Sequence, residues 1–222
     1  MRILVCDTET SGLGPARKAV EVAIIEVDAD LNILQSWESL IDPECPIDAG
    51  AEFIHGISAE MVKDAPTMEE FVTHVMGGQL EGELVVCGHN CQFDIPMLHP
   101  IGNLVWSICT LELARTYVTG PVNFKLDTLR EYFEIPVQGV AHRAMADVMT
   151  TYELLKRILP LSGRTLEQHA LTEERTVHVM TFGKHAGKPL FDLPLPYMQW
   201  LLALPDLDSN LRKSLEQARL LK

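Results

Sequence analysis

The sequence predicts a mixed α/β domain, a β-sheet with helices packed against its faces, followed by a small C-terminal module. The first observation is the order of the predicted elements in residues 1–160, which runs β-β-β-α-β-α-β-α-α. The second is that the first three strands are joined by short polar segments, which is typical of an antiparallel start to a mixed sheet and not of a doubly wound parallel one. The third is an apolar content of 47%, enough for a sizeable core.

The five predicted strands are runs rich in β-branched and other apolar residues. They cover residues 2–6, 20–27, 33–41, 84–87 and 104–109. Helices are predicted after Ser58 and after Thr67, where Glu70 three residues later completes a capping box. Further helices are predicted from apolar positions at helical spacing, at residues 92–98, 111–117, 125–133 and 144–159. Pro160 is expected to end the last of these.

The chain is predicted to divide into a domain at residues 1–160, a linker at 161–176 and a small module at 177–222. The linker is proposed because this stretch is polar and has no periodicity. The apolar residues of the segment PYMQWLL are expected to form the core of the module. They are Met198, Trp200, Leu201 and Leu202.

The net charge of −13 is distributed unevenly between these parts. Residues 1–160 hold 10 Lys and Arg against 24 Asp and Glu, whereas residues 161–222 hold 8 against 7. A protein that grips long duplexes would carry a basic stripe, so an acidic domain predicts a small nucleic-acid footprint with metal ions supplying positive charge. Lys184, His185 and Lys188 form a basic loop suited to phosphates, although a plain docking tail explains the module equally well.

The chain is predicted to be cytoplasmic and not associated with a membrane. No apolar run approaches the roughly 18 residues that a membrane span needs, and the N-terminus reads as a strand and not as a signal peptide. The five cysteines are odd in number and unpaired in spacing, which favours reduced thiols. A zinc site around Cys87, His89 and Cys91 is an alternative, weakened by the lack of a second cysteine pair.

Four carboxylates and a histidine lie where predicted strands give way to helices or loops. They are Asp7, Glu9, Asp94, His142 and Asp147. Asp7 and Glu9 are two residues apart in a strand and therefore project to the same side. Such neighbours repel one another unless a cation lies between them, and oxygen ligands suit Mg²⁺ or Mn²⁺. Asp94 and Asp147 would complete an acidic cup for two ions.

Two such ions can clamp the attacking and leaving oxygens of a phosphoryl displacement. His142 precedes the helix that carries Asp147, and histidine titrates near neutral pH, so it could take a proton from the attacking water. Each motif alone has a structural explanation, because Asp7 suits a turn, Asp94 an N-cap and Asp147 the first turn of a helix. Their combination favours catalysis of phosphodiester hydrolysis.

The segments DTETSGL, HNCQFD and HRAMAD resemble the three motifs of the DnaQ-like 3′→5′ exonucleases, the DEDD superfamily. The spacing of His142 and Asp147 resembles the DEDDh branch. The resemblance covers about residues 1–160 and implies an RNase H-like mixed sheet, two Mg²⁺ or Mn²⁺ ions, and release of nucleoside 5′-monophosphates. Ser11 replaces the second threonine of the usual first motif, a mild change.

The resemblance also implies substrate contacts. Thr10, Leu13 and the histidine of FIHGIS, His55, match positions near the terminal nucleotide, while Asn90 and Phe93 match positions that support the site. The segment MTFGKHAGKPL is similar to a module found in exodeoxyribonuclease X-type enzymes. This similarity favours single-stranded or 3′-ended DNA as substrate and adds Lys184 and Lys188 as candidate contacts.

Several alternatives stay open at this point. An exoribonuclease of the oligoribonuclease or RNase T type would use the same residues and differ only in its contacts to the 2′-hydroxyl, so RNA is a possible substrate. A non-catalytic binding module on the same fold is disfavoured because all five residues are present. A proofreading subunit that acts only with a polymerase is a third possibility, and a homodimer is also possible.

Overall fold

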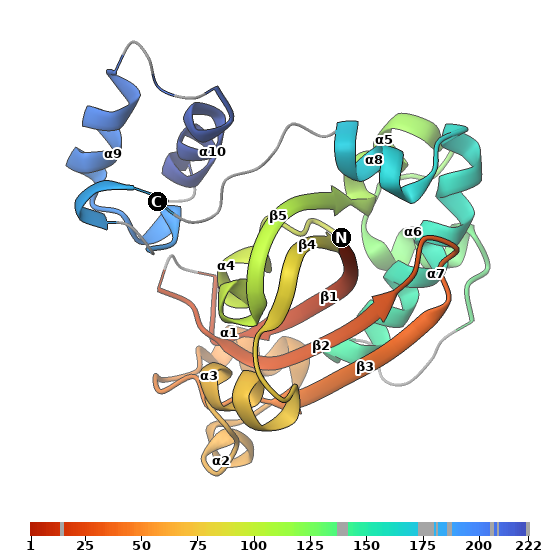
Figure 1. The fold of residues 1–222 in the computed structure, drawn as a ribbon. Coiled ribbons are helices and arrows are strands. Elements are labelled where there is room, and N and C mark those ends of the chain that lie inside the picture. Colours follow the sequence, from red (N-terminus) through yellow and green to blue (C-terminus); the bar gives the residue numbers. More distant parts are fainter. Residues whose placement is uncertain are drawn as a thin grey trace.

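The structure is a computed structural model, and it describes residues 1–13, 16–136, 142–172, 180, 182–185, 188–204, 207 and 209–220. In this part of the chain one sheet has the strand order β3-β2-β1-β4-β5 (Figure 1). The strands are β1 Arg2–Thr10, β2 Ala19–Val27, β3 Ile33–Leu40, β4 Leu80–Gly88 and β5 Gly102–Cys109. β1 to β3 form the predicted antiparallel start, while β4 runs parallel to both β1 and β5. The predicted mixed sheet is confirmed.

The helices lie on both faces of this sheet. They are α1 Ala49–His55, α2 Ala59–Val62, α3 Met68–Glu70, α4 Ile95–Leu98, α5 Thr110–Tyr117, α6 Leu126–Tyr132, α7 Ala144–Ser162 and α8 Leu166–Thr172, with α9 Leu195–Leu202 and α10 Ser209–Leu220 in the C-terminal module. Figure 1 shows α5 to α8 gathered on one side of the sheet, where α7 contacts β1 and β2. The module has a separate apolar core that includes Leu193, Met198, Leu201 and Leu215.

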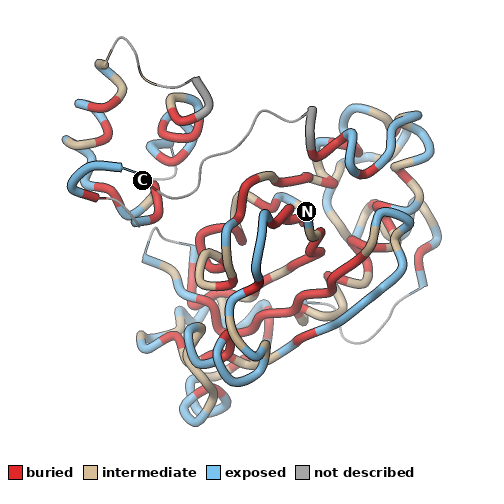
Figure 2. The backbone as a smooth tube through the Cα atoms, viewed as in Figure 1, coloured by how far each residue is buried: buried red, intermediate tan, exposed pale blue. Residues whose placement is uncertain are grey.

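Strand β1 lies in the centre of the sheet and contributes to two cores. Ile3 and Val5 pack with α7 residues such as Val148 in one core, whereas Leu4 and Cys6 belong to the core on the opposite face. Figure 2 shows that the central strands, which lie between the two cores, are buried along much of their length. Since side chains alternate along a strand, the later odd-numbered residues of β1 face α7. This alternation carries the acidic residues of β1 to the α7 side.

Local signals in the sequence explain where several helices begin. Ser58 is the N-cap residue of α2. Thr67 and Glu70 form the predicted capping box, in which the Thr67 hydroxyl accepts from the Glu70 amide and the Glu70 carboxylate accepts from the Thr67 amide. The helix then continues as a single π-helical turn at Phe71–Val75. These features hold the segment that packs Phe71 into the core between α3 and β4.

Three predictions made from the sequence are wrong. Helix α7 passes through Pro160 and ends at Ser162, where Gly163 caps it in a left-handed conformation. Proline costs the helix one hydrogen bond, and the burial of Leu155 and Ile158 in the core outweighs that loss. The linker boundaries are wrong because residues 166–172 form α8, which buries Leu166 and Ala170 in the core beside β5. Trp200 is not in the module core: 56% of its surface is exposed. Residues 173–176 of the predicted linker lie outside the described residues.

Candidate metal and catalytic site

Three of the predicted carboxylates meet at the end of β1. Asp7 and Glu9 project from this strand, and Asp147 lies in the first turn of α7. One oxygen from each lies within 4.8 Å of the other two. No hydrogen bond or ion pair from the described residues engages these three side chains. An all-oxygen set of this kind fits a hard divalent cation.

The electrostatics of the cluster also favour a cation. Asp7 has a pKa well above its usual range, with burial as the largest cause and the neighbouring carboxylates next. Burial and then the charge of Asp147 raise the pKa of Glu9 to about 8. Burial raises the pKa of Asp147 to about 6, although the nearby His142 acts in the opposite direction. A divalent ion would therefore stabilise the ionised carboxylates that the surroundings disfavour.

Asp94 approaches β1 differently. It is the N-cap residue of α4, and one of its oxygens, Oδ1, accepts hydrogen bonds from the Thr8 amide at 3.0 Å and the Thr8 hydroxyl at 2.7 Å. Burial raises the pKa of Asp94 to about 7, against the hydrogen bonds from Thr8 and the charge of Arg17. Both hydrogen bonds described for this carboxylate use Oδ1, so they orient it and leave Oδ2 available. Asp94 lies close enough to Asp7 to raise the pKa of Asp7.

His142 is held at the entrance to α7. Its side chain is exposed, and its backbone is left-handed, with φ of 59°, which is uncommon for a residue other than glycine. The next residue, Arg143, donates from Nε to both oxygens of Glu21 at 2.9 and 3.0 Å. The Ala144 amide donates to the same carboxylate at 2.9 Å. Glu21 on β2 therefore fixes the start of α7 between His142 and Asp147.

The residues that the family resemblance implies for substrate binding differ in their exposure to solvent. Leu13 follows β1 and is 81% exposed, so an apolar contact with a base is sterically open. His55 is buried, and its Nδ1 accepts from the Ile57 amide, so Nε2 carries the proton and donates to the Thr10 carbonyl at 3.2 Å. The Thr10 hydroxyl donates to the Gly12 carbonyl. His55 and Thr10 thus shape the backbone at the end of β1.

The second motif is held by an arginine that the motif itself does not contain. Arg17 donates to the Phe93 carbonyl at 3.0 Å, and its guanidinium lies 4.1 Å from the centre of the Phe93 ring. Asn90 has a left-handed backbone with φ of 66°, and its carbonyl accepts from the Phe93 amide. These contacts fix the turn immediately before Asp94.

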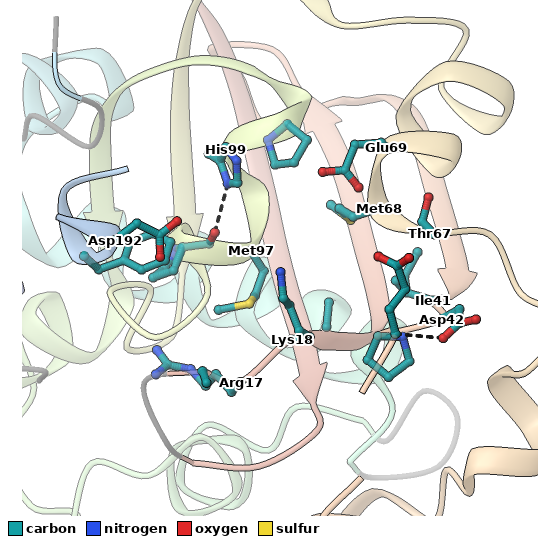
Figure 3. A pocket seen from close by; sticks show the side chains of 17 residues that line it. Arg17, Lys18, Ile41, Asp42, Thr67, Met68, Glu69, Met97, His99 and Asp192 are labelled. Carbon is teal, nitrogen blue, oxygen red and sulfur yellow. Dashed lines mark hydrogen bonds between the residues drawn. The ribbon is translucent and has the colours of Figure 1, made fainter. Parts of the chain in front are cut away.

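A cavity of about 140 Å³ lies beside this turn and is separate from the carboxylate cluster. Figure 3 shows Arg17, Lys18, Met97 and His99 around it, with Asp192 of the C-terminal module at one side. The His99 ring hydrogen-bonds to the Pro96 carbonyl at 3.1 Å. None of the clustered carboxylates lines this cavity, so the cavity is not part of the candidate metal site.

The alternative zinc site does not assemble. Cys87 and Cys91 are buried in different cores, on opposite faces of the sheet. Both nitrogens of His89 are engaged, one with the Thr110 hydroxyl at 3.0 Å and the other with the Phe124 carbonyl at 2.9 Å. His89 is therefore a structural side chain.

The comparisons with known proteins agree with this geometry. A family model described as exonuclease matches residues 4–155, and a second, described as a putative quorum-sensing-regulated virulence factor, matches residues 168–205. Exodeoxyribonuclease 10 of Escherichia coli K12 is 32% identical over 222 residues, covering 96% of each chain. The chain belongs to the exonuclease family. This membership confirms the predicted DnaQ-like relationship and the prediction of a 3′→5′ exonuclease.

Two solved structures extend the comparison. Exonuclease X in complex with 5′-overhanging duplex DNA is 32% identical, with a TM-score of 0.60, and the match covers 76% of this chain and 97% of that one. Escherichia coli exonuclease I in complex with a dT13 oligonucleotide has a TM-score of 0.63 at 20% identity, covering 78% and 44%, and supports the fold alone. The RNase H-like fold is confirmed. Among the described helices, none has the length and apolarity to cross a membrane.

Sequence reasoning missed four residues that hold the site: Thr8, Arg17, Glu21 and Arg143. One signal was present, because Glu21 and Glu26 interrupt an otherwise apolar strand and a buried acid needs a partner. Arg143 lies inside the third motif between two of the predicted site residues. Nothing in the sequence pairs Glu21 with Arg143, which is 122 positions away.

Proposed function

We propose that this chain is a metal-dependent 3′→5′ exodeoxyribonuclease that releases nucleoside 5′-monophosphates. The observation that carries the proposal is the meeting of Asp7, Glu9 and Asp147 at the end of β1, where one oxygen of each lies within 4.8 Å of the other two. DNA is the proposed substrate because the relative that matches 96% of the chain is an exodeoxyribonuclease and the exonuclease X structure contains DNA.

Asp7, Glu9, Asp94 and Asp147 are the proposed ligands of two Mg²⁺ or Mn²⁺ ions. When bound, such ions would polarise the scissile phosphate and neutralise the charge that develops on its oxygens. Thr8 orients the Asp94 carboxylate, and both of its hydrogen bonds to Oδ1 are compatible with a ligand role for Oδ2. The donor set fits the ions because it consists only of oxygen atoms.

His142 is the proposed general base, which takes a proton from the attacking water. Its exposed ring at the entrance to α7 can reach solvent, and it lies close enough to Asp147 for its charge to lower the pKa of that carboxyl.

Leu13 is proposed to contact the terminal base, and Thr10, His55, Asn90 and Phe93 to shape the pocket around it. The chain is proposed to work as a nuclease domain with a separate C-terminal module. A cytoplasmic location and a homodimer remain predictions.

The direct test is digestion of DNA labelled at the 3′ or the 5′ end, with Mg²⁺ or with EDTA. A 3′→5′ exonuclease releases the 3′ label first as a mononucleotide, only with metal. The control is Asp147→Asn, which should show no such release. Parallel digestion of an RNA oligonucleotide of the same sequence tests the sugar: faster cleavage of RNA would contradict the proposed substrate and favour an exoribonuclease.

A further inference from the structure

The C-terminal module has an exposed aromatic surface that the cleavage chemistry does not use. Tyr197 and Trp200 are three residues apart on α9 and therefore share one face of the helix. Their rings stack, with centres 5.5 Å apart and planes inclined by 30°. Trp200 is 56% exposed, although an indole in a small module usually fills the core.

The basic loop lies against this aromatic pair. The ring of His185 packs edge-on against Tyr197, with centres 4.5 Å apart. Gly183 has a left-handed backbone, with φ of 74°, and a Cβ atom there would lie 3.1 Å from the Tyr197 hydroxyl. Glycine is favoured there, because it adopts the left-handed conformation without strain and leaves room for the hydroxyl. Lys184, which lies between these two contacts in the chain, is therefore beside the aromatic pair.

The loop is held in place by buried contacts. His185 is only 8% exposed, and its Nδ1 has no hydrogen-bond partner among the described residues, so packing against Tyr197 holds the ring. The Lys188 amide donates to the His185 carbonyl at 3.1 Å, and the Lys188 carbonyl accepts from the Met180 amide at 2.8 Å. Burial and then the charges of Lys184 and Lys188 lower the pKa of His185, which confirms that both lysines are near.

The helix that carries the aromatic pair is fixed as well. Arg212 on α10 donates to the carbonyls of Leu202 and Leu204, both at 2.6 Å, at the end of α9. Met198 and Leu201, the neighbours of Trp200 on the opposite face, are fully buried. Trp200 is thus presented outward by a rigid element and does not need to move to make contact with a ligand.

The exposed Trp200, the half-buried Tyr197 stacked on it and two exposed lysines fit one class of partner. Bases stack on aromatic faces whatever their identity, and lysines beside them meet the phosphates of the same strand. The charge distribution agrees, because residues 161–222 carry a net +1 while residues 1–160 carry −14. Phe182, 46% exposed, adds a third aromatic side chain beside the same loop.

We propose that Trp200 and Tyr197, with Lys184 and Lys188, bind single-stranded DNA without sequence preference, outside the cleavage site. This inference rests on the proposed function, because the bound strand is part of the DNA that the nuclease domain degrades. The surface holds bases by stacking on Trp200 and holds phosphates at the basic loop. It increases the affinity for long strands and leaves the bond-breaking step to the carboxylate cluster.

The test is binding of fluorescent poly-dT by the full chain in EDTA, where no strand is cleaved. Wild-type protein should bind a strand of about 20 nucleotides more tightly than one of about four. Trp200→Ala should weaken binding of the long strand about tenfold, and Trp200→Phe should restore most of it. Lys184→Ala with Lys188→Ala should weaken binding and reduce its salt dependence.

Leu220→Ala and Lys63→Ala are the matched controls, since Leu220 is an 82% exposed apolar residue of the same module and Lys63 is already paired with Glu60. Neither should change binding. Circular dichroism verifies that each variant is folded. If Trp200→Ala binds the long strand as tightly as wild type, the inference is wrong, and the exonuclease assignment still stands. If the wild type binds DNA but cleaves none with Mg²⁺, the proposed function fails instead.

Discussion

The buried acids of β2 and the half-buried acids of β1 lie on neighbouring strands but have different partners. Glu21 and Glu26 on β2 are each 7% exposed, and each is held by an arginine, Arg143 and Arg2 respectively. Asp7 and Glu9 on β1 have no such partner among the described residues, and their pKa values are raised. Acids that stabilise the fold are paired within the chain. Under the proposed function, the acids of β1 are left for a divalent cation from solution.

The largest expected effect comes from removing one of the unpaired acids. Asp7→Asn or Asp147→Asn should lower the cleavage rate by about 10³-fold or more, because the charge that would hold the metal is lost. The same change relieves repulsion, so the melting temperature in EDTA should rise. Asp64→Asn is the control, because it removes one exposed acid away from the cluster. Full Mg²⁺-dependent activity in either cluster variant would contradict the metal site.

The two ion pairs of β2 allow a matched experiment. Arg143→Gln and Arg2→Gln each leave a buried glutamate without its arginine and should each lower the free energy of unfolding by about 1–3 kcal/mol. Only Arg143 lies beside His142, so only Arg143→Gln should lower kcat, by about tenfold to a hundredfold. Chemical denaturation and initial cleavage rates give the two numbers. Equal loss of kcat in both variants would mean that Arg143 acts through stability alone.

The comparison also predicts how stability depends on pH without metal. Raised pKa values mean that the folded carboxylates keep protons which unfolded ones lose above about pH 4. The contribution of these protonated carboxylates to the free energy of unfolding is therefore complete below about pH 4. It is lost as the pH rises through the pKa values of Asp147, Asp94 and Glu9, at about 6, 7 and 8.

Thermal unfolding in EDTA and in Mg²⁺ measures this dependence. Each kcal/mol lost lowers the melting temperature by about 2–4 °C in a chain of this size. Mg²⁺ should raise the melting temperature more at about pH 8 than at about pH 5, since only ionised carboxylates bind it well. An equal Mg²⁺ effect at both pH values, or a flat profile in EDTA, would show that the cluster does not titrate in this range.

The smallest effect is expected from the hydroxyl that orients Asp94. Thr8→Val keeps the amide hydrogen bond and loses the 2.7 Å bond from the side chain. A single hydrogen bond of this kind contributes about 1 kcal/mol, so cleavage should slow by about threefold to tenfold. Thr8→Ser keeps the hydroxyl and should remain near wild type. Similar rates for Val and Ser would show that the amide alone fixes Asp94.

The sequence was most informative where chemistry depends on short-range spacing. Asp7 and Glu9 face one side because strand residues alternate, and this required no knowledge of the fold. The meeting of Asp147 with them could be expected only from the joint motifs, because it depends on how α7 crosses β1. The Glu21–Arg143 pair was out of reach, since an ion pair between distant positions leaves no local pattern.

In the C-terminal part of the chain, the sequence pattern did not predict which residues are buried. Leu166 and Ala170 lie in a polar stretch without clear periodicity, yet α8 buries both against the nuclease core. Tertiary packing decided that helix, and propensity alone did not. Trp200 was assigned to the core by its apolar neighbours, but it lies on the opposite face of α9 from Met198 and Leu201. An eight-residue helix is too short for periodicity to identify its buried face.

Strand β1 supplies both core residues and the acids of the candidate site, so its length tolerates little change. The same alternation that gives Ile3 and Val5 to one core delivers Asp7 and Glu9 to the α7 side. Inserting a single residue between Val5 and Asp7 would turn both acids toward the opposite layer and bring Thr8 into their place. Packing in the first half of the strand could survive such an insertion while catalysis would not. A two-residue insertion would keep both acids on the α7 side of the sheet but would move them along the strand, away from Asp147. The site therefore depends both on which face of the sheet the acids occupy and on their position along β1.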